Sequence, residues 1–338
     1  MLRIAQHPKD ARIPLYALRP NPLLCPHIEY REVRAMASPQ AEARKAMMRQ
    51  MREMLSGGGG PVNIDEQRAR MAAAPSGATV PEGVTVTETY AGGCRALWHD
   101  PEGAAMDRVI LYFHGGGYVL GSHTRSANSV SHIAKAVGCR ALNVDYRLAP
   151  EHPFPAAVDD AVSAYRWLMA QGVGARHIAV SGDSAGGGLA LALLLALKQQ
   201  GLPQPAAAVP LSAWTDMEGT GDTMKTKLAD DLIISPEGLR PMAGHYLGEQ
   251  DPKSPLASPL HGDYAGLPPL YLQVGGDEAL LDDSTRVAEA ARAAGVEVKL
   301  DIFPEMQHVF QNGAGNVPEA DDAIQRIGAW LRPKLALA

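Results

Sequence analysis

Cysteine is scarce in this chain of 338 residues: Cys25, Cys94 and Cys139 form an odd set, and no pair has CxxC spacing. Such a set provides neither a disulfide framework nor a cysteine-rich zinc site. An HExxH motif is also missing, and the histidines do not cluster with carboxylates at the intervals that metal ligands need. We therefore expect thiols that pack as small apolar side chains, and no metal site.

A strong excess of charge is missing as well. The formal net charge is -6 and the eleven histidines are scattered, so the sequence has no basic stripe that could neutralise nucleic-acid phosphates. Nucleic acid is therefore not an expected partner.

The chain has no long apolar run. Residues 1–20 mix charged side chains with prolines and lack the apolar core of a secretory signal. The most apolar run, Leu189–Leu197, is far shorter than the roughly 20 residues needed to cross a bilayer. These absences predict a cytoplasmic protein without a membrane span.

The first 80 residues differ in pattern from the rest. Residues 38–56 predict a helix with Ser38 as its N-cap. Four glycines, Gly57–Gly60, then end this helix, and the Ala-rich segment up to Pro81 predicts a second short helix and a linker. We expect residues 1–80 to form a helical cap or arm and residues 81–338 to form the main domain.

From Val84 onward, β-branched and apolar segments alternate with helical patterns. Strands are expected at residues 84–90, 94–99, 109–113, 141–144, 178–180, 206–211, 270–274 and 296–303, the first two as an edge hairpin. Helices are expected at residues 156–170, 185–199, 236–246, 283–294 and 318–335. This alternation indicates a parallel sheet covered on both faces, with its functional site at the carboxyl ends of the strands.

Ser184 lies in a GxSxG motif, Gly182-Asp183-Ser184-Ala185-Gly186, between a predicted strand and an apolar helix. A nucleophilic serine at such a turn has a strained backbone, so the positions two before and two after it must lack bulk. The N–H of Ala185, at the start of the helix, can face a developing oxyanion. The motif therefore predicts that Ser184 is a nucleophile.

The segment His114-Gly115-Gly116-Gly117 directly follows the predicted strand at residues 109–113. Its glycines expose main-chain N–H groups at the same edge of the sheet, and Gly115 and Gly116 are the expected remaining oxyanion donors. The alternative is a dinucleotide-binding turn, but the following helix and the ribose-binding acid of that motif are missing. We expect His114 to order this loop rather than to transfer protons.

A carboxylate and a histidine follow two later strands. The segment Val274-Gly275-Gly276-Asp277-Glu278 places Asp277 at a strand end, and His308 lies between the last strand and the final helix. The rival acids Asp282 and Asp283 are typical of the N-terminal cap of the next helix. We expect His308 to act as general base for Ser184, and Asp277 to orient its imidazole.

Together these motifs resemble the hormone-sensitive-lipase-like esterases, bacterial family IV, also described as α/β-hydrolase fold 3. The similarity covers about residues 109–331. It rests on HGGGY at His114, the block from Asp145 to Ala157, GDSAGG at Gly182, Gly276-Asp277 and His308. One departure is Val309, where the family frequently has glycine.

The resemblance implies an α/β-hydrolase fold with a central, mostly parallel eight-stranded sheet flanked by helices. It also implies that residues 81–338 form the catalytic domain and that the helical cap is completed by residues 214–246. The expected activity is that of a serine carboxylesterase which hydrolyses short- to medium-chain esters through an acyl-enzyme and needs no cofactor. The expected partner is a small-molecule ester.

Several alternatives stay open. A lactone, carbamate or amide hydrolase would use the same triad. A ligand-binding protein of this fold, such as the gibberellin receptor, would have an incomplete triad, whereas all three candidate members are present here. The sequence also permits a homodimer in which the last strand pairs across the dimer edge.

Overall fold

The computed structural model describes residues 37–55 and 63–338. The described residues all belong to one compact unit, residues 32–338. Cys25 and the glycine run Gly57–Gly60 lie outside the described residues.

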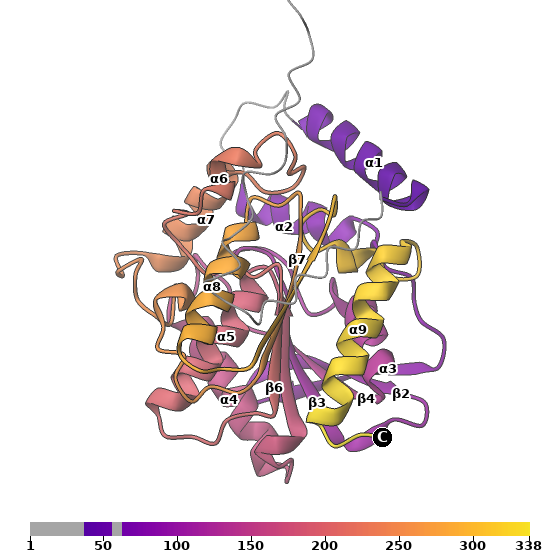
Figure 1. The fold of residues 1–338 in the computed structure, drawn as a ribbon, viewed down its shortest axis with the longest axis vertical. Helices are drawn as coiled ribbons and strands as arrows, with labels where there is room; N and C mark the ends of the chain where they lie inside the picture. The colour runs from indigo at the N-terminus through magenta and orange to yellow at the C-terminus, as the bar shows by residue number, and fades with distance from the viewer. Residues whose placement is uncertain (1–36, 56–62) are drawn as a thin grey trace, which may run out of the picture. The chain divides into compact units, whose positions relative to one another are not determined.

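Eight strands form one sheet in the order β1-β2-β4-β3-β5-β6-β7-β8 (Figure 1). Strand β2 is antiparallel to β1 and β4, and the other neighbours are parallel. The strands are β1 (Val84–Ala91), β2 (Cys94–Pro101), β3 (Ala105–Phe113), β4 (Cys139–Asp145), β5 (Ile178–Asp183), β6 (Ala207–Leu211), β7 (Leu270–Gly275) and β8 (Val298–Phe303). The mostly parallel eight-stranded sheet expected from the sequence is confirmed, with the predicted hairpin at its edge.

Helices cover both faces of this sheet. In Figure 1, α4 (Ala156–Ala170), α5 (Ala185–Gln199) and α8 (Leu281–Ala293) lie on one side, and α3 (Ala127–Val137) and α9 (Pro318–Lys334) lie on the other. Three short 3-10 turns are η2 (Ala175–His177), η3 (Pro259–His261) and η4 (Phe310–Gly313). Helix α5 is apolar all round because it packs against β5, β6 and α4, and residues 185–197 are all buried.

Helix α3 is not among the helices predicted from the sequence. Its apolar residues Val130, Ile133, Ala134 and Val137 are buried against β2, β4 and α9. Serine, histidine, lysine and alanine separate them, and the residue before the helix, Ser126, makes no side-chain cap. Tertiary packing therefore stabilises α3 more than local propensity does.

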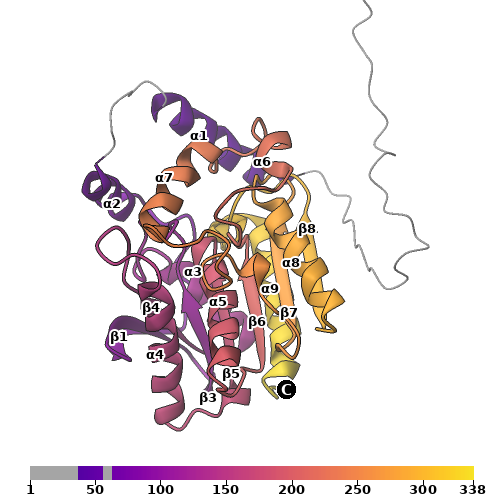
Figure 2. The same cartoon turned by 90° about the vertical axis from the view of Figure 1, so that its left-hand side faces the viewer.

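Four helices lie over the carboxyl ends of the strands (Figures 1 and 2): α1 (Pro39–Leu55), α2 (Ile64–Ala73), α6 (Thr223–Thr226) and α7 (Pro236–Leu247). The predicted cap of α1 is confirmed, because the Ser38 hydroxyl oxygen accepts the N–H of Ala41 at 3.1 Å. The same hydroxyl donates to Glu319, which connects the start of α1 to α9. Within the described residues, no helix has the length and apolar character needed to cross a bilayer.

The register of the strands brings the chemically important loops to one edge of the sheet. The last residues of neighbouring strands are paired as Phe113 with Gly182, Asp183 with Leu211, and Gly275 with Phe303. The segments that follow these strands, which include Ser184, Glu278 and His308, therefore leave the sheet side by side.

Candidate active site

Ser184 occupies a sharp turn between β5 and α5. Its φ of 54° and ψ of -121° are strained for a residue other than glycine, and its N–H donates to the carbonyl of Leu211 at 2.8 Å. The flanking glycines are required sterically, because a Cβ at Gly182 would collide with the Gly186 carbonyl and one at Gly186 with the Phe113 carbonyl. This is the turn that the GxSxG motif predicted, and it fixes Ser184 at the carboxyl edge of the sheet.

The imidazole of His308 is held by Glu278, not by Asp277. Nδ1 of His308 lies 2.9 Å from Oε2 of Glu278, and both side chains are buried. The expectation that Asp277 orients the base is therefore wrong. Both carboxylates follow β7, but they point in different directions, and only that of Glu278 points toward His308.

Asp277 instead faces two lysines. Its carboxylate lies 3.8 Å from Nζ of Lys45, on α1, and 3.7 Å from Nζ of Lys227, just after α6. The pKa of Asp277 is raised on balance, because burial raises it and the two lysines lower it only in part. Asp277 thus connects α1 to the segment after α6 and makes no ion pair with His308.

The rival acids Asp282 and Asp283 also make structural contacts. Oδ2 of Asp282 accepts the N–H of Thr223 at 3.0 Å, and Oδ2 of Asp283 accepts the N–H of Thr215 at 2.7 Å. Burial raises the pKa of Asp283 to about 7. Both carboxylates fix the segment after β6 to the start of α8, so neither orients the histidine.

The surroundings of Glu278 leave one of its oxygens free for His308. Oε1 accepts two hydrogen bonds, one from the Ser212 hydroxyl at 2.6 Å and one from the Gly275 N–H at 2.6 Å. Oε2 faces the imidazole. Sequence reasoning missed Glu278 because it stands next to Asp277 at the same strand end, and the residue types alone do not show which side chain turns inward.

The pKa of His308 results from opposing effects. Burial lowers it, but the nearby carboxylates of Glu278, Asp231 and Asp183 raise it, and the net pKa is above the usual 6.5. The site therefore stabilises the imidazolium form that a general base passes through.

The loop of residues 114–121, called here the oxyanion loop, follows β3. Gly116 and Gly117 have positive φ values of 126° and 63°, and a Cβ at Gly116 would collide with the Leu120 carbonyl. Among the described residues, none accepts a hydrogen bond from the N–H of Gly116 or Gly117. These two N–H groups are therefore available to an anionic oxygen.

Gly115 has a different environment from the next two glycines. The buried Asp183 carboxylate lies so close to Gly115 that a Cβ there would collide with it, and it accepts the Tyr112 hydroxyl at 2.8 Å. Burial raises the pKa of Asp183, and the hydrogen bond from Tyr112 lowers it without reversing the rise. Because this carboxylate lies beside it, Gly115 is a weaker candidate oxyanion donor than the sequence suggested.

His114 makes contacts that order the oxyanion loop. Its ring stacks on Tyr146 with centroids 4.4 Å apart, and its Nδ1 lies 2.8 Å from the Gly115 carbonyl oxygen. The Tyr146 hydroxyl donates to the His114 carbonyl at 2.7 Å. These contacts support the interpretation of His114 as a residue that shapes the loop.

Arg68, on α2, forms hydrogen bonds that hold the oxyanion loop in place. Its guanidinium donates to the carbonyls of Val119 at 2.9 Å and Ala149 at 2.8 Å, and it pairs with Glu151. One side chain therefore connects α2, the oxyanion loop and the proline-containing block that follows β4. This contact could not be predicted from the sequence, because Arg68 belongs to no motif.

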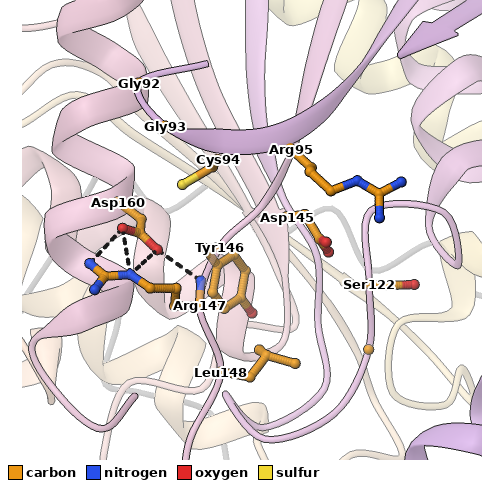
Figure 3. A pocket seen from close by; sticks show the side chains of 11 residues that line it. Gly92, Gly93, Cys94, Arg95, Ser122, Asp145, Tyr146, Arg147, Leu148 and Asp160 are labelled. Carbon is orange, nitrogen blue, oxygen red and sulfur yellow. Dashed lines mark hydrogen bonds and ion pairs between the residues drawn. The ribbon is translucent and has the colours of Figure 1, made fainter. Parts of the chain in front are cut away.

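A cavity of about 600 Å³ lies between the β1–β2 turn and the loop after β4 (Figure 3). Its lining residues are Gly92, Gly93, Cys94, Arg95, Gly121, Ser122, Asp145, Tyr146, Arg147, Leu148 and Asp160. Ser184, Glu278 and His308 are not among them. The Arg147–Asp160 ion pair at 2.7 Å crosses one wall, and burial raises the pKa of the Cys94 thiol to about 12. The cavity thus borders the oxyanion loop at Gly121, and the raised pKa of its thiol disfavours the reactive thiolate form.

Among the residues that the structure describes, Asp216, Glu218 and His261 form one group of potential metal ligands, with ligand atoms within 4.8 Å of one another. The Asp216 carboxylate is already occupied, because it accepts hydrogen bonds from Arg286 at 3.0 Å and from the Thr220 hydroxyl at 2.6 Å. These contacts fit a structural carboxylate rather than a metal ligand.

Comparison with known proteins gives a consistent result. A family model described as the alpha/beta hydrolase fold matches residues 110–312. An acetyl-hydrolase from Streptomyces hygroscopicus is 43% identical over 298 residues, which cover 88% of this chain and 97% of the relative. An esterase from Acinetobacter venetianus is 38% identical over 67% of this chain and 75% of its own length.

Solved structures of esterases are similar over most of the chain. A crystal structure of EstE5 soaked with p-nitrophenyl butyrate has a TM-score of 0.83 and 42% identity, and it covers 89% of this chain and 100% of its own. An esterase from the bacterial hormone-sensitive lipase family has a TM-score of 0.82 and 43% identity, with the same coverage. Another matching structure is described as EstE5-PMSF.

Proposed function

Because the chain belongs to the α/β hydrolase fold family and is a carboxylic-ester hydrolase within it, we propose that it cleaves esters through a covalent acyl-enzyme on Ser184. His308 is the general base, and Glu278 orients its imidazole. The N–H groups of Gly116 and Ala185, joined by that of Gly117, stabilise the oxyanion. The family resemblance drawn from the sequence motifs is confirmed.

The proposed reaction has two halves. His308 accepts the Ser184 proton at Nε2 as the serine oxygen attacks the ester carbonyl, and the carbonyl oxygen becomes an anion facing the main-chain N–H groups. The imidazolium then protonates the departing alcohol, which leaves the acyl group on Ser184. In the second half His308 accepts a proton from water, which attacks the acyl carbonyl, and returns a proton to Ser184 as the carboxylic acid leaves.

One observation carries this proposal: the 2.9 Å contact between buried His308 and Glu278 lies at the same sheet edge as the strained turn of Ser184. The raised pKa of His308 supports its role as base. PMSF is a sulfonyl fluoride, a reagent class that modifies serine nucleophiles, so the structure described as EstE5-PMSF adds support from a relative.

We further propose that short- to medium-chain acyl groups are preferred. Bulky aromatic rings pack together in this region: Tyr118 stacks on Tyr246 at 3.8 Å and lies 6.2 Å from Trp214, whose main-chain N–H donates to the Ser184 carbonyl at 3.0 Å. The Met242 side chain contacts Gly117 of the oxyanion loop so closely that a Cβ there would collide with its sulfur. A relative named acetyl-hydrolase and another soaked with a butyrate ester fit the same size range.

The helices over the sheet edge are proposed to form the substrate cap, as the sequence suggested for residues 1–80 and 214–246. The described parts are α1 and α2, and the α6 and α7 segment. The cytoplasmic location and a homodimer through the outer strand β8 stay predictions. Size-exclusion chromatography with light scattering tests the dimer.

A substrate panel tests the proposed specificity. We expect p-nitrophenyl acetate and butyrate to give the highest kcat/KM, and p-nitrophenyl palmitate to give at least about tenfold less. Lactones, carbamates and anilides of matched acyl length test the alternative reactions on the same triad. A lactone or amide hydrolysed faster than every ester would overturn the assignment as a carboxylesterase.

A further inference from the structure

Ser212 occupies a constrained position between the acid and the base. It directly follows β6, its side chain is fully buried, and its N–H donates to the Gln273 carbonyl at 2.8 Å. Its φ of 46° lies in the left-handed region, which a serine rarely adopts. The backbone on both sides therefore holds Ser212 in an unfavourable conformation.

The Ser212 hydroxyl forms hydrogen bonds to two different loops, one as a donor and one as an acceptor. It donates to Oε1 of Glu278 at 2.6 Å and accepts the N–H of Val309 at 3.1 Å. Val309 is the residue after His308, and Glu278 is the partner of the His308 ring. One oxygen thus connects the loop that carries the acid to the loop that carries the base.

The same contacts restrict the rotation of the Glu278 carboxylate. With Oε1 fixed by Ser212 and by the Gly275 N–H, Oε2 is left facing His308. On the other loop, Val309 has a φ of 51°, which is strained for a β-branched residue, and its N–H is held by Ser212. Two strained residues that bond to each other beside a base indicate a conformation kept for function.

We propose that Ser212 is a positioning residue of the hydrolase, which acts by aligning the Glu278 carboxylate and the His308 backbone with one hydroxyl. This inference rests on the proposed function. Its consequence is that removal of the hydroxyl slows turnover at His308 while substrate binding is retained. A hydroxyl that merely satisfied buried polar groups would affect stability and not turnover.

The test uses Ser212→Ala and Ser212→Gly in the full chain, with p-nitrophenyl butyrate as substrate. Both variants lack the hydroxyl, but glycine accepts the left-handed backbone without strain, so Ser212→Gly keeps the test valid if Ser212→Ala folds poorly. Ser131→Ala is the matched control, because Ser131 is also buried and its hydroxyl lies 2.8 Å from Nδ1 of His99, away from the site. Active-site titration corrects each rate for the amount of folded enzyme.

We expect both Ser212 variants to lose kcat by about 10- to 100-fold, with KM changed less than about twofold. Ser131→Ala is expected to keep kcat. In a double-mutant cycle, Ser212→Ala is expected to lower kcat less in a Glu278→Gln background than in the wild type, because one of its two contacts acts through that carboxylate.

Wild-type kcat in both Ser212 variants would overturn the proposal, and so would a full, additive loss in the Glu278→Gln background. Failure of the underlying function is distinguishable. It would appear as a wild-type enzyme without ester hydrolysis, or as hydrolysis that survives Ser184→Ala. Ser184-dependent hydrolysis with unaffected Ser212 variants would reject the positioning role alone.

Discussion

Oε2 of Glu278 lies 2.9 Å from Nδ1 of His308, whereas Asp277, the adjacent residue, faces Lys45 and Lys227. Two neighbouring carboxylates at one strand end therefore have separate tasks. One contacts the candidate base, and the other forms ion pairs with segments that lie over the sheet edge.

This separation predicts opposite results for two similar substitutions. Glu278→Gln should lower kcat/KM by about three to four orders of magnitude, because an amide neither stabilises the imidazolium nor holds the correct tautomer. Asp277→Asn should change it less than about fivefold, since it weakens only partly exposed ion pairs. Steady-state kinetics with p-nitrophenyl butyrate measures both, and a severe loss in Asp277→Asn alone would reject the assignment of the acid.

The raised pKa of His308 predicts the acidic limb of the pH profile. Only the neutral imidazole accepts the serine proton, so kcat/KM should rise with pH with a midpoint above 6.5. In Glu278→Gln the largest of the charges that raise the pKa of His308 is lost, whereas burial still lowers this pKa, so the midpoint should move down. Measurement of kcat/KM from pH 5 to 9 checks this shift. Asp277→Asn is the control, and its midpoint should stay in place. A midpoint that does not move in Glu278→Gln contradicts the account.

Gly186 should tolerate no side chain. Alanine favours a helix over glycine by about 1 kcal/mol, but its Cβ would collide with the Phe113 carbonyl, and this overpacking should cost about 3 kcal/mol or more. Gly186→Ala should therefore lower Tm. Gly244, on α7, has no atom within 4 Å of an added Cβ, so Gly244→Ala should keep or raise Tm. Calorimetry measures the Tm of both variants, and an equal change in Tm would argue against a tight turn at Gly186.

Arg68 should influence the reaction from outside the triad. Arg68→Ala removes bonds to the Val119 and Ala149 carbonyls, and the loosened oxyanion loop should lower kcat/KM by about tenfold. Arg70 on the same helix is exposed and pairs only with Glu66 at 3.6 Å among the described residues, so Arg70→Ala is the control with an unchanged rate. Indistinguishable rates in the two variants would show that α2 does not support the loop.

The sequence predicted the sheet, its covering helices and the turn at Ser184 because each depends on local patterns. Alternating apolar segments define strands, and glycines flanking a serine define a turn that only they permit. Helix α3 was missed because its stability comes from Val130 and Ile133 packing against the sheet and α9, which the local sequence does not reveal.

The directions of side chains and N–H groups could not be predicted in the same way. Asp277 and Glu278 differ by one position, and only the folded loop determines which faces His308. Gly115 and Gly116 look equivalent in the sequence, yet the Asp183 carboxylate lies beside the first and the Leu120 carbonyl beside the second. Ser212 is in no motif, and its two contacts, with Glu278 and Val309, span distant parts of the chain.

A rapid-mixing experiment with p-nitrophenyl butyrate directly tests whether an acyl-enzyme forms on Ser184. An acyl-enzyme on Ser184 predicts that, where deacylation is the slower step, about one p-nitrophenol per active site appears in a burst before the steady state. Mass spectrometry of the quenched enzyme should then find the butyryl group on Ser184, and Ser184→Ala should show neither signal. A burst or a butyryl adduct that persists in folded Ser184→Ala would contradict the account.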